Sequence, residues 1–182
     1  MRDFELTQYL NEKSKSILQL GASTGGFIET YQQKGWSVLG YDYSPISIKL
    51  MLEKNIPARL VNLNALNSES NSLIYKDLLQ NDMQKYCNIF MFRVLNYLDM
   101  KAQTYLLHLI ISNSLPGTVF FIGDQFDESK GYENAFPETK RNFKTSFFAP
   151  RTDMEFLLNT TVHLNIESHN RKDELIVIRK RG

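Results

Sequence analysis

Apolar and polar residues follow one another along the chain in blocks that predict a repeating order of strands and helices. Short apolar runs, which are typical of buried strands, occupy residues 16–20, 36–41, 58–63, 88–92 and 118–122. Between these runs, apolar residues three and four positions apart predict helices around Leu6, Tyr9 and Leu10, around Phe27, Ile28 and Tyr31, around Ile48, Met51 and Leu52, and around Leu106, Leu109 and Ile110. Strands that alternate with helices indicate an α/β fold with a mostly parallel sheet.

The pattern changes in the last third of the chain. Residues 125–150 are polar and aromatic without clear periodicity, and residues 153–158 are expected to form a short helix. Two predicted strands, 162–166 and 175–178, then follow with no helix between them, so they are expected to form an antiparallel hairpin. The predicted fold is therefore a doubly wound, mostly parallel seven-stranded sheet with a C-terminal antiparallel hairpin.

Composition and charge narrow the class of protein. A chain of 182 residues, 42% hydrophobic and 23% charged, fits a single globular domain over 1–182. The net charge of +1 gives no general attraction to nucleic acid or to an anionic membrane. A single cysteine, Cys87, excludes an internal disulfide and a cysteine-rich metal site, and we expect no metal.

Location is the next inference from the sequence. No apolar run approaches the roughly 20 residues of a membrane helix. The N-terminal residues alternate charged and apolar positions, and they lack the apolar core of a secretory signal. We therefore expect a cytoplasmic protein without a membrane partner.

Glycine and polar residues follow the first two predicted strands, at the edge where ligands bind in open α/β sheets. Gly21 and Gly25 allow a sharp turn and a close approach of the backbone to a ligand. Asp42 follows the second strand, where an acid can accept hydrogen bonds from both hydroxyls of a ribose. A tight turn without a ligand, and a helix cap at Asp42, are the alternatives, although Ser44 before Pro45 already supplies a good cap.

Four segments in this order resemble the motifs of class I S-adenosylmethionine-dependent methyltransferases: SILQLGASTGGF, VLGYDYSPISIKLM, ARLVNLNAL and NIFMFRVLNYLD. The resemblance as a whole covers about residues 15–125. The resemblance implies a Rossmann-like methyltransferase fold and S-adenosyl-L-methionine as cofactor, with S-adenosyl-L-homocysteine as product. It implies methyl transfer to a small organic molecule, with an oxygen, nitrogen or carbon acceptor left open. A catalytically silent binding protein on this fold, or a protein or RNA methyltransferase, remains an alternative.

The same resemblance assigns cofactor-binding roles residue by residue. Gly21 and Gly25 match the glycines that pass beneath the methionine part of the cofactor, and Asp42 matches the acid that binds the ribose. Tyr43, beside that acid, would pack on the adenine.

Two further segments match the family. Asn64 and Ala65 correspond to the segment that meets the adenine amino group. Arg93 corresponds to the position near the methionine carboxyl and the transferable methyl, and residues 94–98 resemble the short helix that follows in this family.

Two positions of the cofactor motif depart from the family. Gln19 stands where an acid is usual, and Ser23 stands where the middle glycine is usual. An amide can still accept a hydrogen bond from the cofactor ammonium, but without charge attraction. Both residues are expected to contact the cofactor, and both motivate the catalytically silent alternative.

Candidates for catalysis and substrate binding come from the remaining strand ends. Arg93 and Asp124 are the candidate catalytic residues, with a surface salt bridge and a helix cap as their respective alternatives. His108 is expected to be structural, and His163 and His169 lie away from the expected cleft. The 125–150 segment resembles a substrate-covering insert, and its candidate pocket residues are Tyr132, Phe136, Phe143 and Phe147. The oligomeric state is left open.

Overall fold

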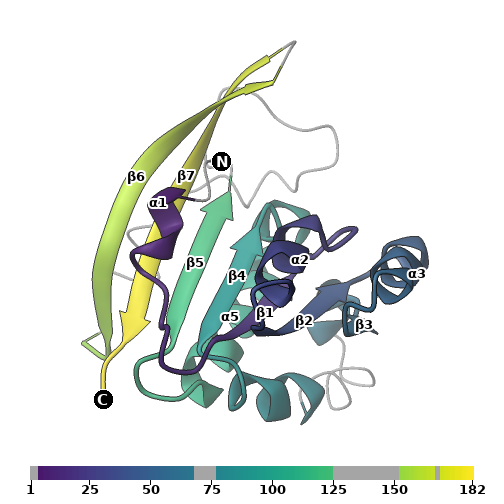
Figure 1. The fold of residues 1–182 in the computed structure, drawn as a ribbon. Coiled ribbons are helices and arrows are strands. Elements are labelled where there is room, and N and C mark those ends of the chain that lie inside the picture. The colour runs from purple at the N-terminus through teal and green to yellow at the C-terminus, as the bar shows by residue number, and fades with distance from the viewer. Residues whose placement is uncertain (1–3, 68–76, 125–151, 167–168) are drawn as a thin grey trace.

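The computed structural model describes residues 4–67, 77–124, 152–166 and 169–182 (Figure 1). A helical segment at residues 77–83 lies between η1 and β4. The other elements are α1 (Phe4–Thr7), β1 (Ser16–Leu20), α2 (Gly26–Gln32), β2 (Ser37–Asp42), α3 (Pro45–Glu53), β3 (Ala58–Leu60), η1 (Leu63–Asn67), β4 (Asn88–Phe92), η2 (Leu95–Tyr97), α5 (Met100–Asn113), β5 (Val119–Asp124), β6 (Met154–Ile166) and β7 (His169–Lys180).

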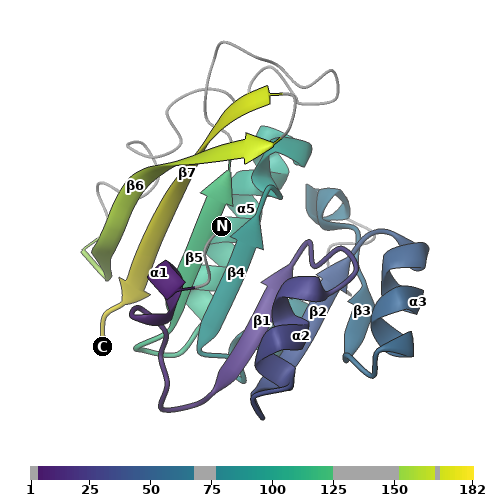
Figure 2. The same ribbon diagram turned by 45° about the horizontal axis from the view of Figure 1, so that its top comes forward.

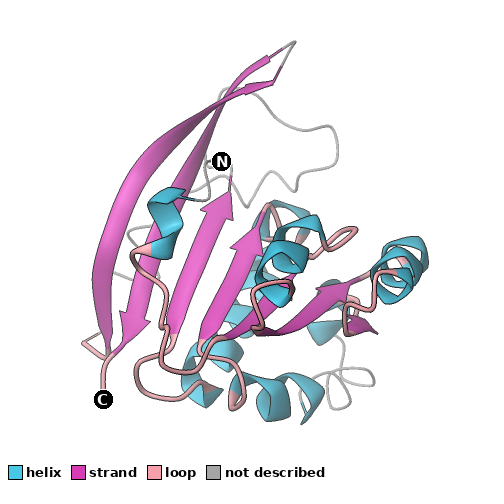
Figure 3. Cartoon of the chain, in the orientation of Figure 1, coloured by secondary structure: helices cyan, strands magenta, loops and turns pink. Residues whose placement is uncertain are grey.

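The strands form one seven-stranded sheet in the order β3-β2-β1-β4-β5-β7-β6. The first five strands are parallel, whereas β7 runs antiparallel to both β5 and β6 (Figure 3). This arrangement confirms the predicted doubly wound sheet with its C-terminal hairpin. The apolar runs also predicted the observed bounds of β1 and β4 correctly, because both strands are covered on both faces and are therefore mostly apolar.

Helices cover both faces of the sheet (Figure 2). In β4, Phe90 belongs to the core layer under α2 and α3, whereas Ile89 and Met91 belong to the layer under α5. All three side chains are at most 1% exposed. Phe90 also stacks on Phe121 of β5, with ring centroids 4.2 Å apart. Successive side chains along a central strand therefore point alternately into the two core layers.

The segment at residues 153–158 is a correction to the sequence analysis, because it forms the first part of β6 and not a helix. The pairing of β6 with β7 shifts register between Phe156 and Leu158. Such a bulge interrupts the alternation of side chains between the two faces of the strand. The adjacent apolar residues Leu157 and Leu158 therefore fit the spacing of a helix better than that of a regular strand. The hairpin is also longer than expected, with strands of 13 and 12 residues, and it extends past the end of β5 (Figures 1 and 2).

Smaller differences concern element lengths and burial. The N-terminal helix ends at Thr7, and the third strand ends at Leu60, after which η1 begins at Leu63. Leu52, expected on the buried face of α3, is 54% exposed, whereas Met51 is fully buried and Ile48 packs partly buried against the same core. The described residues contain no helix with the length and apolar character needed to cross a membrane.

The strand order places a topological switch point between β1 and β4. From β1 the chain proceeds to β2 and β3 on one side, and from β4 it proceeds to β5 on the other. The loops that follow β1 and β4 therefore lead to opposite faces of the sheet. A crevice at the carboxyl ends of these strands is the usual ligand position in such sheets.

Candidate functional site

The turn after β1 depends on two glycines. Gly21 and Gly25 have φ angles of 68° and 76°, in the left-handed region that side chains disfavour. A Cβ atom on Gly21 would lie 2.5 Å from Cγ2 of Val94, and one on Gly25 would lie 2.7 Å from Cγ of Met51. The turn therefore packs closely against both the segment after β4 and α3.

Ser23, at the position of the usual middle glycine, also has a left-handed backbone conformation. Its φ angle is 51°, and its side chain is exposed. The cost of this conformation is about 1–3 kcal/mol for a residue other than glycine. The hydrogen bond that its backbone makes to Asp42 offsets part of that cost.

Asp42 joins the glycine turn to the start of α3. Its Oδ2 accepts a hydrogen bond of 2.8 Å from the backbone N–H of Ser23, and its Oδ1 accepts one of 2.9 Å from Ser44. The side chain is 8% exposed. Ser44 itself caps α3, with its Oγ 3.3 Å from the backbone nitrogen of Ser47, as predicted. A carboxylate has about four acceptor positions, so Asp42 retains two for ligand hydroxyls.

The strand end that carries Asp42 is anchored from the other face of the sheet. The hydroxyl of Tyr41 donates a hydrogen bond to Oδ2 of Asp82, which is 2% exposed and also faces Arg59 and Lys85 at 3.4 and 3.3 Å. Burial, and then the hydrogen bond to Asp82, raise the pKa of Tyr41 well above its ordinary value. Burial also raises the pKa of Tyr86. Sequence analysis missed this cluster, because Asp82 lies in a polar segment with no distinguishing motif.

Gln19 lies on β1 immediately before the glycine turn and is 6% exposed. Its Oε1 is buried and makes no hydrogen bond within the described residues. A buried acceptor without a donor costs about 1–3 kcal/mol. The structure therefore leaves an acceptor without a donor at this strand end, among the described residues.

Exposed apolar side chains lie beside Asp42. Tyr43 is 76% exposed, and Ile46, in the first turn of α3, is 72% exposed. Leu60, the β3 residue paired with Asp42, is 53% exposed. Together these three residues offer apolar surface of the kind that packs against a flat aromatic ring.

The segment after β3 approaches the turn after β4. The Nδ2 atom of Asn64 donates to the carbonyl oxygen of Tyr97 at 2.8 Å, and its Oδ1 accepts from the backbone nitrogen of Asp99 at 3.2 Å. Ala65 is half-buried beside it. Both ends of the Asn64 amide are thus engaged, which the motif match did not indicate, because both partners lie more than 30 residues away.

Arg93 begins the turn after β4. Its φ angle of 55° is unusual for a residue other than glycine, and its backbone nitrogen donates to the carbonyl oxygen of Gly123 at 2.7 Å. Unfavourable backbone angles of this kind persist where the surroundings enforce them, often at functional sites. Asp124 ends β5, one residue beyond Gly123, so topology places these two candidates at neighbouring strand ends.

Several other candidates lie away from this edge or beyond the described residues. Tyr132, Phe136, Phe143 and Phe147 fall outside the described residues. His163 lies in β6, and His169 is the first residue of β7.

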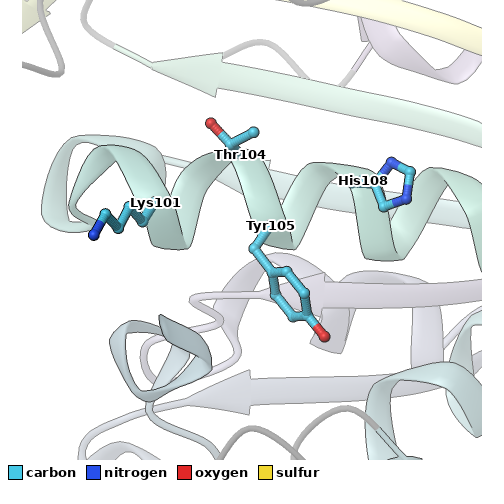
Figure 4. A pocket seen from close by; sticks show the side chains of 4 residues that line it. All are labelled: Lys101, Thr104, Tyr105 and His108. Atoms are coloured by element: carbon cyan, nitrogen blue, oxygen red, sulfur yellow. The ribbon is translucent and has the colours of Figure 1, made fainter. Parts of the chain in front are cut away.

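His108 proves to be exposed on α5. It lines an open depression of about 640 Å³ together with Lys101, Thr104 and Tyr105 (Figure 4). In Figure 4 the side chains of Thr104 and Tyr105 point to different sides of the helix, so these groups do not converge on a ligand. Over the described ranges, no three His, Cys, Asp or Glu side chains gather to hold a metal ion.

Comparison with known proteins gives matches of structure and none of sequence. No protein-family model matches the chain, and no curated protein matches it by sequence. A SAM-dependent methyltransferase from Methanosarcina mazei is 14% identical, with a TM-score of 0.69 and 97% of each chain covered.

Two further similar structures contain S-adenosyl-L-homocysteine or SAM. The N-methyltransferase NodS from Bradyrhizobium japonicum, in complex with S-adenosyl-L-homocysteine, is 13% identical, with a TM-score of 0.64 over 98% of this chain and 87% of that one. The magnesium protoporphyrin IX methyltransferase ChlM from Synechocystis, with bound SAM, is 10% identical, with a TM-score of 0.62 over 98% and 77%. The chain has the fold of the class I S-adenosylmethionine-dependent methyltransferases.

Proposed function

We propose that the chain is an S-adenosylmethionine-dependent methyltransferase that acts on a small organic molecule. The observation that carries the proposal is the buried Oε1 atom of Gln19, which has no hydrogen bond among the described residues and lies directly before the glycine turn. An ammonium group at this position donates a charge-assisted hydrogen bond to that oxygen. The likeness in fold to solved methyltransferases supports the same conclusion.

The other residues of this edge fit the remaining parts of the cofactor. The turn at Gly21 and Gly25, whose left-handed backbone only glycine adopts easily, would lie against the methionine part. Asp42 keeps two acceptor positions for the ribose hydroxyls, and the exposed ring of Tyr43 offers a face for the adenine. When bound, S-adenosyl-L-methionine supplies an electrophilic methyl group. The chain's own residues contribute mainly orientation, which is the principal requirement of an in-line displacement.

Arg93 and Asp124 are the proposed residues around the acceptor. The guanidinium of Arg93 would hold an anionic group, either the methionine carboxylate or a carboxylate or phosphate of the substrate. The carboxylate of Asp124 would take the proton from an acceptor that must lose one. Tyr132, Phe136, Phe143 and Phe147, which lie outside the described residues, are proposed to line the substrate pocket.

A small-molecule acceptor is supported by charge and by the structural neighbours. The net charge of +1 gives no general attraction to a nucleic acid. NodS and ChlM, which share the fold, are described as an N-methyltransferase and a magnesium protoporphyrin IX methyltransferase. With a single cysteine, the chain also suits a reducing compartment, and we propose the cytoplasm.

A catalytically silent binding protein is the second candidate, and Gln19 motivates it. The amide provides no charge to attract the cofactor ammonium, unlike the acid that the family usually has there. Cofactor binding without turnover would favour this second candidate.

Isothermal titration calorimetry of the full chain with S-adenosyl-L-methionine and S-adenosyl-L-homocysteine tests the proposal. Both ligands are expected to bind, and Asp42→Ala is expected to weaken both by at least about tenfold, because two backbone N–H groups and the ribose lose their acceptor. Glu53→Gln, on the exposed side of α3, serves as the control. Absence of binding at about 1 mM ligand would contradict the proposal. A panel of small nucleophiles, assayed for S-adenosyl-L-homocysteine release, then separates turnover from binding alone.

A further inference from the structure

The side-chain amide of Asn64 joins the two loops that follow β3 and β4. Its Nδ2 donates to the carbonyl oxygen of Tyr97 at 2.8 Å, and its Oδ1 accepts from the backbone nitrogen of Asp99 at 3.2 Å. We propose that Asn64 is a positioning residue, which holds the turn after β4 beside the cofactor site and does not itself distinguish the adenine base. This inference rests on the proposed function and refines the role of one residue within it.

The turn at residues 94–99 depends on side chains for much of its hydrogen bonding. Two short-range backbone bonds lie within it, from the N–H of Tyr97 to the carbonyl oxygen of Val94 at 3.1 Å and from the N–H of Leu98 to the carbonyl oxygen of Leu95 at 3.0 Å. Gln103 of α5 donates from Nε2 to the carbonyl oxygens of Leu95 and Leu98, at 2.7 and 3.0 Å. The buried side of the turn is thus held by Gln103.

Asn64 holds the opposite, exposed side of the same turn. It supplies the donor for the carbonyl oxygen of Tyr97, which Gln103 does not reach. It also accepts from Asp99, whose own carboxylate caps α5 through a 2.8 Å bond from the backbone nitrogen of Ala102. One amide therefore ties the loop after β3 to both η2 and the start of α5.

The position of this turn matters because of the residues at its beginning. Val94 packs against Gly21 so closely that a Cβ atom on the glycine would lie 2.5 Å from its Cγ2. Arg93, one residue earlier, has the unfavourable φ angle of 55°. A displacement of the turn would therefore move the wall of the proposed methionine pocket and release the backbone of Arg93.

The chemistry of the amide separates positioning from base recognition. Asn64 uses one donor and one acceptor at the same time, and an aspartate has no donor for the carbonyl oxygen of Tyr97. An aspartate would also place a negative charge against that carbonyl and near the carboxylate of Asp99. For an adenine amino group, in contrast, the oxygen of either residue is a suitable acceptor. The substitution Asn64→Asp therefore breaks the bond to Tyr97, keeps an acceptor for the backbone nitrogen of Asp99, and preserves base recognition.

The experiment compares Asn64→Asp, Asn64→Ala and a matched control, Asn113→Asp. Asn113 donates from Nδ2 to the carbonyl oxygen of Leu109 at 2.8 Å, the same bond type at the far end of α5. Each full-length variant is titrated with S-adenosyl-L-homocysteine and with S-inosyl-L-homocysteine, in which a carbonyl oxygen replaces the adenine amino group. Hydrogen exchange of the backbone amides at residues 97–99 is measured without ligand.

Positioning by Asn64 predicts that each variant weakens the two ligands equally, by about tenfold in Asn64→Asp, which loses one hydrogen bond, and by more in Asn64→Ala, which loses two. The ratio of the two affinities stays at its wild-type value, and the 97–99 amides exchange faster, whereas Asn113→Asp changes none of these. The inference is overturned if Asn64→Asp binds S-adenosyl-L-homocysteine as tightly as wild type, or if either Asn64 variant changes the affinity ratio. If the wild-type chain binds neither ligand, the proposed function fails and the role beside a cofactor fails with it. The exchange rates then show separately whether Asn64 holds the turn.

Discussion

The backbone N–H of Ser23 donates a hydrogen bond of 2.8 Å to Oδ2 of Asp42, across 19 residues of chain. The acid proposed to bind the ribose thus also holds the glycine turn proposed to bind the methionine part. Since Oδ1 accepts from Ser44 at the start of α3, one carboxylate organises three segments of the site. We therefore expect stability and cofactor affinity to be coupled at Asp42.

Asp42→Asn tests this coupling. The amide retains one oxygen and points an NH₂ group at one of the two backbone donors, so one hydrogen bond is lost and a donor is left unsatisfied. The free energy of unfolding is expected to fall by about 1–3 kcal/mol, and cofactor affinity by about tenfold or more. Urea unfolding and calorimetry measure the two effects. A loss of affinity with unchanged stability would show that Asp42 contacts only the ligand.

Gly21→Ala is expected to destabilise the chain through two separate causes. The φ angle of 68° opposes any side chain, and the new Cβ would lie 2.5 Å from Cγ2 of Val94. We expect a loss of about 1–3 kcal/mol in urea unfolding. Adding Val94→Ala should remove the steric part and leave the backbone part, which a double-mutant cycle resolves.

Gly26→Ala is the matched control for Gly21→Ala. It lies at the start of α2 without a positive φ angle, and a Cβ there meets nothing within 4 Å. We expect it to be neutral or stabilising by up to about 1 kcal/mol. Equal destabilisation by both alanines would contradict the proposed steric and backbone causes.

Gln19→Leu is expected to move stability and affinity in opposite directions. Removing the buried Oε1, which lacks a hydrogen bond among the described residues, should raise the free energy of unfolding by about 1 kcal/mol. The same change removes the proposed acceptor for the cofactor ammonium, so affinity for S-adenosyl-L-homocysteine is expected to fall. Affinity for 5′-methylthioadenosine, which has no ammonium group, should stay unchanged. Equal loss for both ligands would place Gln19 outside the ammonium site.

Tyr41→Phe tests the buried pair with Asp82. The loss of one donor to a buried carboxylate should lower the free energy of unfolding by about 1–3 kcal/mol near neutral pH. The pKa of Tyr41 is raised in the folded state, so the folded chain keeps a proton that the unfolded chain loses above about pH 10. The stability from this group is therefore complete below about pH 10 and declines as the pH rises further.

Unfolding in urea at about pH 8 and pH 11 measures this difference. The gap between wild type and Tyr41→Phe should narrow at the higher pH, because the wild type alone loses the contribution of Tyr41. Ile17→Val, a core change without a titrating group, should lower stability equally at both values. A gap for Tyr41→Phe that is constant with pH would contradict the raised pKa.

Much of the fold followed from local pattern. The runs at Ser16–Leu20 and Asn88–Phe92 gave their strands with the observed bounds, because strands buried on both faces need apolar residues throughout. Ser44 before Pro45 predicted the start of α3 for a local reason as well, since a cap and its recipient lie three residues apart. The first part of β6 escaped prediction because the register shift between Phe156 and Leu158 disrupts the period of two.

The placement of the candidate residues at strand ends could be predicted from the sequence, whereas most of their contacts could not. Gln19 and Asp42 were identified because glycine turns and strand ends are visible in sequence. The engagement of Asn64 with Tyr97 and Asp99, and the burial of Asp82 against Tyr41, depend on contacts across more than 30 residues. Spacing along the chain carries no information about such contacts, which arise only when the sheet brings the loops together.

The position of β7 between β5 and β6 has a consequence for biosynthesis. As the chain leaves the ribosome, β5 has its inner neighbour β4 ready, but its outer neighbour is made only after β6. Until residues 169–180 emerge, one edge of the growing sheet and the whole of β6 lack their pairing partner. An unpaired edge of apolar strand is a site for association between nascent chains. We therefore expect the growing chain to be most prone to association before residues 169–180 have emerged.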